Sequence, residues 1–569
     1  MFWAQLKRML LVIYFIPCLC FMFLKMNYSR KMVLNKKKTS IELLFIVTII
    51  IAFVFELACS EFQYQRLLNF SENILFALIL IIPYTLINNK KIKSFYFNIV
   101  FVFFNIILFF ETSYYYIFNV NISPSVIYVL LETNHIEAKE FLSFYLDVYI
   151  IVYAILLFLL VIASIAANNK SLLYINKLVF DAKVLMLSLV IILIIIKITP
   201  LRHQNLPYLL AKSFYVVYYE SGVVNASAYK SKKGVFNNTK ATHKSKNKLY
   251  VVVIGESTTN NNMSLYGYDR NTNPLLSKQE GLSIFKDVIS PHAGTTASIS
   301  KALSLQNYEN SNKEKGSIIQ LLNAADYETY WLSNQQPVGF AETDITRVVK
   351  ACDTKIYLST KNSEDTRLYD EVIFDKIDEI LSINQNNKVL FVHLQGSHIY
   401  YKNRYPERFN VFKNKVNNNI ISKARDYKII NEYDNAILYN DYVVNSIIKK
   451  IKNKQSESFV IYFSDHGEEV YHTVKFVGHN DDVGTLPMFQ IPFILWQSET
   501  FKNNNPIEID LDRPYMTDDL FHSIAHLCGV DNEHVNLEKS IFSKSFKDRK
   551  RIILNNKDYD SLYAIKNKN

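Results

Sequence analysis

The stretch Phe459-Val460-Ile461-Tyr462-Phe463-Ser464-Asp465-His466-Gly467-Glu468 decides both the fold and the candidate site. Its first five residues are apolar and rich in β-branched and aromatic side chains, which is typical of a buried strand. Asp465 and His466 follow at the carboxyl end of that strand, where open α/β sheets hold their ligands. Carboxylate oxygen and imidazole nitrogen are both metal ligands, but taken alone such a pair equally fits a surface turn.

A second strand end of the same kind lies earlier in the chain. The apolar run Leu249–Ile254 is followed directly by Gly255-Glu256-Ser257. If both strands belong to one parallel sheet, Glu256 and Asp465 face the same edge of that sheet. Two carboxylates and one histidine then converge, and the pattern predicts a metal site.

Composition divides the 569-residue chain into an apolar first half and an ordinarily polar second half, which predicts a membrane part followed by a soluble part. The formal net charge of +11 does not indicate nucleic acid. The lysines are scattered over loops and linkers, and we find no zinc finger, aromatic RNA-binding motif or basic helix. The five cysteines form no C-x-x-C motif, and whether Cys352 pairs with Cys528 stays open.

Apolar runs in the first half are long enough to cross a bilayer. They are Ser40–Cys59, Phe70–Ile87, Phe95–Phe110, Val148–Ala167 and Val184–Thr199. The lysines of segments 36–38, 90–93 and 170–183 fall on one side, which the positive-inside rule makes cytoplasmic. The chain after Pro200 is therefore expected on the outer side. The run Met9–Met26 is either an extra membrane helix or an upstream extension.

These observations predict four parts of the chain. Residues 1–39 form an N-terminal extension, and residues 40–200 a transmembrane domain of about five helices. Residues 201–248 form an interfacial helix and a linker rich in Lys, Asn and Ser. Residues 249–569 alternate strand-like runs with helical patterns, which predicts an α/β sandwich with a largely parallel sheet.

A candidate nucleophile lies between the two strand ends, in Pro291-His292-Ala293-Gly294-Thr295-Thr296-Ala297-Ser298. Gly294 permits a tight turn, and the following residues can open a helix. A threonine hydroxyl at a helix N-terminus suits attack on phosphorus, because free amides there bind phosphate oxygens. As an isolated feature Thr295 is better explained as a helix cap.

A series of short motifs runs through the second half in a fixed order. It comprises Gly255-Glu256-Ser257, Asn261–Tyr268, Asn271–Pro274, the Thr295 segment, Trp331–Gln335, Gly396-Ser397-His398, Asn403–Pro406, Tyr433-Asp434-Asn435, Ser464–Glu468 and Gly478-His479-Asn480, preceded by Glu132–Asn134 and Glu137-Ala138 in the loop between two spans. In order and spacing the series resembles the membrane-anchored phosphoethanolamine transferases of Gram-negative bacteria, within the alkaline phosphatase/sulfatase superfamily. The resemblance implies an N-terminal α-helical membrane domain and a C-terminal α/β sandwich of that superfamily's type.

The resemblance also implies the residues of the site. Zinc would be held by Glu256, Asp465 and His466, with Thr295 as nucleophile and fourth ligand. Thr296 is a second candidate nucleophile, but with Thr295 the residue three positions later is Ser298, as in the family. His398 and His479 would hold the substrate phosphate, transfer protons or bind a second zinc.

Further residues match positions near the substrate of the family. These are Thr133, Glu137, Asn334 and Glu468. One departure concerns the branch. Pro291 and Lys301 stand where transferases that modify lipid A carry cysteines around the nucleophile, which favours the branch acting on lipopolysaccharide core sugars.

The implied activity is transfer of phosphoethanolamine from phosphatidylethanolamine to a lipopolysaccharide acceptor, either a core sugar or lipid A. The resemblance places the chain in the bacterial inner membrane, with the catalytic domain in the periplasm. A phosphoglycerol transferase and a sulfatase- or phosphodiesterase-type hydrolase remain alternatives, as does a binding ectodomain without catalysis. A sulfatase would need a Cys or Ser in a Cys/Ser-x-Pro-x-Arg motif, which the Thr295 segment does not offer.

Overall fold

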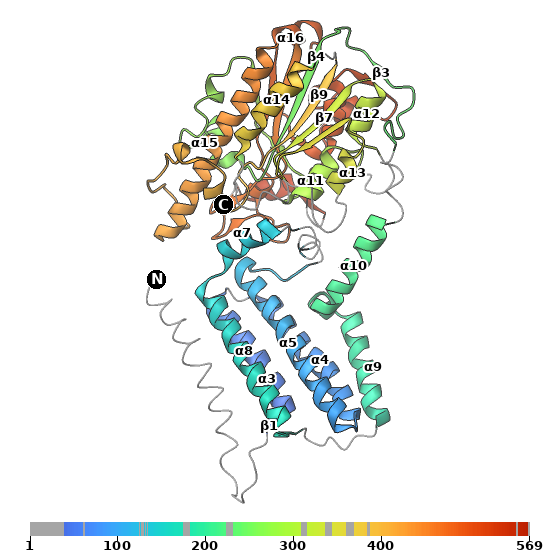
Figure 1. Cartoon of the computed structure of the whole chain (residues 1–569), viewed down its shortest axis with the longest axis vertical. Helices are drawn as coiled ribbons and strands as arrows, with labels where there is room; N and C mark the ends of the chain where they lie inside the picture. The colour runs from blue at the N-terminus through green and yellow to red at the C-terminus, as the bar shows by residue number, and fades with distance from the viewer. Residues whose placement is uncertain are drawn as a thin grey trace, which may run out of the picture. The chain divides into compact units, whose positions relative to one another are not determined.

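The computed structural model describes residues 39–60, 63–123, 126, 130, 133, 135–174, 182–222, 231–308, 316–335, 344–359, 369–383, 387–553 and 556–566 (Figure 1). The run Met9–Met26 and the extension before residue 39 lie outside them. The chain divides into two compact units. The first comprises Met1–Leu130 and Leu142–Val217, and the second Leu131–Phe141 and Tyr218–Asn569.

The first unit is built from helices. They are α3 (Ile41–Cys59), α4 (Tyr64–Leu86), α5 (Lys90–Phe118), α8 (Val148–Asn169), α9 (Ala182–Ile198) and most of α10 (Leu206–Gly222), with a parallel bridge between β1 (Thr39–Ser40) and β2 (Leu173–Tyr174). Among the described residues, four helices are long and apolar enough to cross a membrane: α3, α4, α5 and α8. Helix α9 covers the fifth predicted span but has 17 residues, so the count of about five stays a prediction.

Aromatic side chains fill the interior of the helical unit. Phe55 of α3 stacks on Tyr153 of α8 at 4.6 Å between ring centroids, and Phe45 meets Phe101 of α5 edge to face at 5.2 Å. Such pairs add to the packing energy because the ring edges and faces carry opposite partial charge. They tie α3, α5 and α8 into one bundle.

The second unit is organised around a mixed sheet. Within the described residues the sheet has seven strands in the order β5-β13-β10-β4-β9-β7-β8. Their bounds are β4 (Lys248–Gly255), β5 (Leu282–Phe285), β7 (Glu328–Ser333), β8 (Thr354–Tyr357), β9 (Lys388–His393), β10 (Glu457–Ser464) and β13 (Phe493–Gln497). Strands β10, β4, β9, β7 and β8 pair in parallel, while β13 runs antiparallel to both its neighbours. The predicted α/β sandwich with a largely parallel sheet is confirmed.

Both faces of this sheet are covered, which explains the unbroken apolar runs of its central strands. All eight residues of β4 are buried. Tyr250, Val252 and Ile254 belong to one core cluster, so the alternate residues Val251 and Val253 face the other side. In Figure 1 the strands lie between α15 and α12.

The helices of this unit are α11 (Thr295–Ala302), α12 (Ile318–Ala324), α13 (Asp344–Val349), α14 (Ile373–Ser382), α15 (Ala424–Lys452), α16 (Glu499–Asn504), α17 (Leu520–Leu527) and α18 (Tyr559–Lys566). Helix α7 (His135–Tyr145) precedes α8. Short strands also pair in twos: β14 (Tyr515–Met516) with β6 (Val288–Ile289), β11 (Glu469–Val470) with β12 (Val477–Gly478), β15 (Val530–Asp531) with β3 (Lys240–Ala241), and β16 (Ile552–Ile553) with β17 (Lys557–Asp558). Cys352 and Cys528 are both buried and free, so they form no disulfide with each other.

The register of β4 and β10 places the two predicted strand ends side by side. Gly255 pairs with Ser464, so Glu256 and Asp465 leave the sheet at neighbouring positions on the same edge. The expectation drawn from the two apolar runs is confirmed.

Candidate active site

Glu256 and Asp465 are fixed by the backbone that follows their strands. Ser257 adopts a positive φ of 54°, which directs its N–H to Asp465 Oδ1 at 3.1 Å, while its hydroxyl donates to Glu256 Oε1 at 2.9 Å. A non-glycine residue in this conformation is strained, and such strain gathers at functional sites. The backbone N–H of His466 donates to the same Asp465 oxygen at 2.7 Å.

Two glycines allow the chain to pack closely around these residues. A Cβ on Gly396, whose φ is 54°, would lie 2.6 Å from the carbonyl oxygen of Glu256. A Cβ on Gly467 would lie 2.1 Å from the carbonyl oxygen of Pro487. Both contacts are with backbone that cannot move aside, so a side chain at either position would displace the site.

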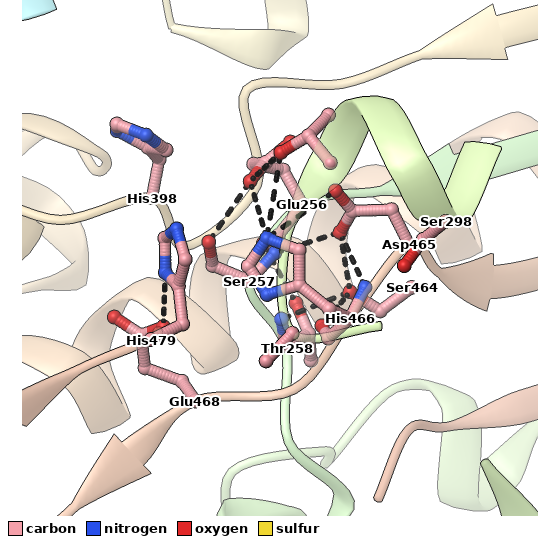
Figure 2. Close-up of polar contacts among 12 residues, drawn as sticks. Glu256, Ser257, Thr258, Ser298, His398, Ser464, Asp465, His466, Glu468 and His479 are labelled. Carbon is pink, nitrogen blue, oxygen red and sulfur yellow. Dashed lines mark hydrogen bonds and ion pairs between the residues drawn. The ribbon is translucent and has the colours of Figure 1, made fainter. Parts of the chain in front are cut away.

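The side chains of Glu256, Asp465 and His466 form a group that fits a metal ion (Figure 2). His466 Nε2 lies 3.3 Å from Glu256 Oε1 and 3.5 Å from Asp465 Oδ2. Asp465 Oδ2 is buried and has no hydrogen-bond partner among the described residues, so an acceptor is left over at the centre of the group. His466 Nδ1 is 2.8 Å from the carbonyl oxygen of Gly467, which fixes the proton there and leaves Nε2 for a ligand. Two carboxylates and an imidazole are ligands that suit zinc.

The charges of this group oppose one another as long as no cation is present. Burial raises the pKa of Asp465 well above its ordinary value, and the charge of Glu256 raises it further. Burial also works against ionisation of Glu256, but the hydrogen bond and charge of His466 outweigh it and hold the pKa of Glu256 low. A divalent cation would offset the repulsion between the two carboxylates.

Thr295 is the first residue of α11 and brings its hydroxyl to the same centre. Its Oγ1 lies 3.1 and 3.2 Å from the two carboxylate oxygens of Glu256 and 3.4 Å from His466 Nε2. Gly294 caps the helix in an extended conformation, and Ser298 Oγ donates to the carbonyl oxygen of His292 at 3.0 Å. The predicted helix start at Thr295 is confirmed, and Thr295 lies with Glu256, Asp465 and His466.

His479 stands beside this group, held by Glu468. The ring centroids of His466 and His479 are 4.1 Å apart. Glu468 Oε2 lies 2.8 Å from His479 Nδ1, and Tyr401 donates to Glu468 Oε1 at 2.6 Å. His466, Glu468 and His479 are also close enough to hold a metal ion together.

His398 lies next to His479, with 6.2 Å between the ring centroids (Figure 2). Arg404 donates to the carbonyl oxygens of His398 and Ile399 and so fixes this loop. Burial lowers the pKa of His398 to about 4. The ring is therefore neutral at neutral pH and can accept a proton.

Gln335 and Asp370 support the site, and the sequence analysis assigned neither of them a role. Gln335 Nε2 donates to Glu256 Oε2 at 3.1 Å and to the carbonyl oxygen of Leu394 at 2.8 Å. Asp370 accepts from the backbone N–H groups of Gln395 and Gly396, both at 2.9 Å. Gln335 follows β7 at the same sheet edge, so its position near the site could have been predicted from the strand pattern. Asp370 follows no strand, and no sequence pattern indicates its role.

The remaining predicted residues lie as follows. Asn334 is buried and donates to Asp370 Oδ1 at 2.9 Å, a contact that supports the loop at Gln395. Thr133 and Glu137 belong to the second unit, and Glu137 lies on α7. The side chain of Glu137 is outside the part of the chain that the structure describes. Substrate contacts of these three residues stay predictions.

Comparison with known proteins first gives the class. Residues 248–530 match the sulfatase family model, so the second unit is a sulfatase-type α/β domain. The crystal structure of the C-terminal periplasmic domain of EptC from Escherichia coli, in complex with Zn, covers 57% of this chain and 96% of its own at 34% identity, with a TM-score of 0.54. The integral membrane protein lipooligosaccharide phosphoethanolamine transferase A from Neisseria meningitidis shares the fold over 89% of this chain and 99% of its own, with a TM-score of 0.65 at 20% identity.

The particular family follows from a curated relative. Phosphoethanolamine transferase EptC of Escherichia coli (strain K12) is 32% identical over 484 residues, which cover 79% of this chain and 83% of the relative. The chain belongs to the phosphoethanolamine transferase family, and it is an enzyme with apolar helices that suit a membrane anchor. The predicted family is confirmed, and the match to EptC is consistent with the lipopolysaccharide-core branch.

Proposed function

We propose that this enzyme transfers phosphoethanolamine from phosphatidylethanolamine to a lipopolysaccharide acceptor through a covalent intermediate on Thr295. The observation that carries the proposal is the position of Thr295 Oγ1, within 3.1 to 3.4 Å of Glu256 Oε1, Glu256 Oε2 and His466 Nε2. A hydroxyl held against metal-binding side chains at a helix start is placed for attack on a phosphodiester.

Glu256, Asp465, His466 and Thr295 would hold zinc, as the Zn complex of the EptC domain suggests. When bound, zinc lowers the pKa of a ligated hydroxyl and stabilises negative charge on phosphoryl oxygens. Glu256 accepts the hydrogen bond of the Thr295 hydroxyl and so orients Oγ1.

In the first step of the proposed reaction the Thr295 hydroxyl gives up its proton, and the leaving glycerol oxygen gains one. The bond from Thr295 Oγ1 to phosphorus forms, and the bond from phosphorus to the glycerol oxygen breaks, which releases diacylglycerol after that oxygen takes a proton. In the second step an acceptor hydroxyl or phosphate attacks the same phosphorus and frees Thr295. His479, oriented by Glu468, and the neutral His398 are the proposed proton carriers.

The proposed donor also accounts for the helical unit. Phosphatidylethanolamine is held in a bilayer, so an enzyme that draws on it gains from a membrane anchor. We place the chain in the inner membrane with the catalytic domain in the periplasm, because the basic loops fall on the opposite side of the spans. Transmembrane residues 40–200, a connecting segment at 201–248 and a catalytic domain at 249–569 follow as the proposed division.

The proposal is tested with full-length enzyme in vesicles that contain either phosphatidylethanolamine or phosphatidylglycerol, together with purified lipopolysaccharide. Phosphatidylethanolamine should yield diacylglycerol and lipopolysaccharide heavier by one phosphoethanolamine. Fragment spectra would then separate a core-sugar acceptor from lipid A. Transfer only from phosphatidylglycerol would identify a phosphoglycerol transferase, and release of free phosphoethanolamine without a modified acceptor would identify a hydrolase. Either outcome would overturn the proposal.

A further inference from the structure

Side chains from separate segments converge on His292, three residues before Thr295. His292 Nδ1 lies 3.1 Å from Asp481 Oδ2, and Lys301 Nζ lies 2.5 Å from His292 Nε2. Tyr308 stacks on the imidazole with 5.7 Å between ring centroids. The side chains of His292 and Asp481 are 17% and 22% exposed, so water screens their contact only in part.

The chemistry of these groups fixes how the protons are arranged. An ionised Asp481 only accepts hydrogen bonds, so His292 Nδ1 carries the proton of that contact. The lone pair on Nε2 then accepts from the Lys301 ammonium, which only donates. A neutral imidazole in one tautomer therefore joins a carboxylate to an ammonium group, and the two charges cancel. Charge-assisted hydrogen bonds of this kind are about twice as strong as neutral ones.

The network fastens the loop that leads into α11. Asp481 Oδ1 also accepts the backbone N–H of Ala293 at 2.7 Å. The carbonyl oxygen of His292 accepts from the hydroxyls of Ser290 and Ser298, at 2.8 and 3.0 Å. Lys301 belongs to α11 itself, so the helix that starts with Thr295 is pinned to its own leading loop.

The same network ties this loop to a second part of the site. Asp481 follows His479 by two residues in the chain. The segment that presents His479 is thereby joined to the segment that presents Thr295.

We propose that Asp481, His292 and Lys301 form a positioning network that holds the Thr295 hydroxyl in its attacking position relative to His479. Asp481 accepts the backbone N–H of Ala293, and the carbonyl oxygen of His292 accepts from Ser298, so the network acts on Thr295 through the loop that leads into α11. The inference rests on the proposed role of Thr295 as nucleophile. A displacement of about 1 Å at a reacting atom can cost about 10²-fold in rate.

The test uses matched variants of the full-length enzyme. Lys301→Met removes the charge and keeps the stem, whereas Lys301→Arg keeps a donor. His292→Phe keeps the ring against Tyr308 and removes both nitrogens, whereas His292→Gln restores one donor and one acceptor. Lys286→Met is the control, because it breaks an ion pair to Asp512 whose side chains are 64% and 75% exposed.

Two readouts are taken for each variant: kcat and KM for the lipid donor, and hydrogen exchange of the peptide 290–302. Lys301→Met and His292→Phe should each lower kcat by about 10- to 100-fold with KM and bound zinc unchanged, and should speed exchange in this peptide. The double variant should be no worse than the poorer single variant, since both remove one connected network. Lys301→Arg and His292→Gln should recover most of the loss.

Exchange is measured without substrate, so it judges the network even if the proposed transfer reaction is wrong. The network would be overturned if hydrogen exchange of the peptide 290–302 were no faster in Lys301→Met and His292→Phe than in Lys286→Met. Faster exchange with kcat within about twofold of wild type would overturn its positioning role. If the two disruptive variants fail to fold, Lys301→Arg and His292→Gln decide: full activity supports the network, and a loss as large as that of a null variant contradicts it.

Discussion

Each unit of the molecule buries acidic side chains, and Glu56 in the helical unit is partnered differently from Glu256 and Asp465 in the sheet unit. In the helical unit the Glu56 carboxylate accepts hydrogen bonds from Arg66 Nε at 3.0 Å and from the Thr112 hydroxyl at 3.1 Å. The Glu72 carboxylate accepts a hydrogen bond from the Asn205 amide at 2.6 Å. In the sheet unit Glu256 and Asp465 face each other and His466, and Asp465 Oδ2 has no hydrogen-bond partner within the described part of the chain.

The difference separates a structural cluster from a functional one. The Glu56 carboxylate is paired with the Arg66 guanidinium and accepts from the Thr112 hydroxyl, so the folded protein itself supplies the cation that balances its charge. Within the described part of the chain, the ion pairs of the sheet-edge carboxylates are with His466. We propose that an external divalent ion completes that group, so that buried carboxylates have a packing role in one unit and form a zinc site in the other.

The largest effect is expected from breaking the sheet-edge cluster. Glu256→Ala and Asp465→Ala should each lose bound zinc and lower transfer by about 10³-fold, since each removes charge that holds the ion. Metal analysis of purified protein and the vesicle assay measure both quantities. The melting temperature should fall towards that of the metal-free wild type, because the folded wild type gains stability from the bound ion. A variant with full zinc and normal turnover would remove that residue from the site.

The opposite result is expected from breaking the helical cluster. Arg66→Met leaves the Glu56 carboxylate buried without its guanidinium and should destabilise the helical unit by about 3–5 kcal/mol. Zinc content of the folded fraction should stay at the wild-type level. Thermal unfolding in detergent measures the loss of stability, and metal analysis of the same samples measures the zinc content. The double variant Arg66→Met, Glu56→Gln should recover part of the stability, and a further loss instead would contradict the ion-pair account.

A smaller effect is expected where a carboxylate acts through a histidine. Glu468→Met removes the acceptor that orients His479 and should lower kcat by about 10- to 100-fold. Glu468→Gln keeps an acceptor for His479 Nδ1 and should lose less. Tyr401→Phe is the control, since it removes the other hydrogen bond to Glu468. Equal kcat in Glu468→Met and wild type would show that orientation of His479 does not matter.

The sequence was sufficient for the parts of the site that follow buried strands. Glu256, Asp465 and His466 were predicted because an apolar β-branched run fixes a strand, and parallel strands bring their carboxyl ends to one edge. Thr295 was found because a glycine followed by helix-forming residues marks a helix start. The network of His292, Lys301 and Asp481 was not predicted. Asp481 is far from His292 and Lys301 in the chain, and only the fold brings the three side chains together.

The contacts of Gln335 and Asn334 could not be predicted from the strand pattern. Gln335 follows a strand of the same sheet, yet an amide beside a metal ligand has no pattern that distinguishes it from any loop glutamine. Asn334 was predicted near substrate through the resemblance, while its amide contacts Asp370. The sequence fixes which residues leave the sheet at its edge. Which way each side chain then turns depends on loops whose course no local pattern encodes.

The central claim is that the sheet-edge cluster serves a covalent transfer by Thr295, and one measurement tests it directly. Full-length enzyme is incubated with phosphatidylethanolamine in the absence of acceptor, digested and analysed by mass spectrometry. The peptide that contains Thr295 should gain the mass of one phosphoethanolamine, and lipopolysaccharide added before digestion should remove it. Thr295→Ala should show no adduct, whereas Thr296→Ala should be labelled as wild type. An adduct on Thr296, or full transfer activity in Thr295→Ala, would contradict the account.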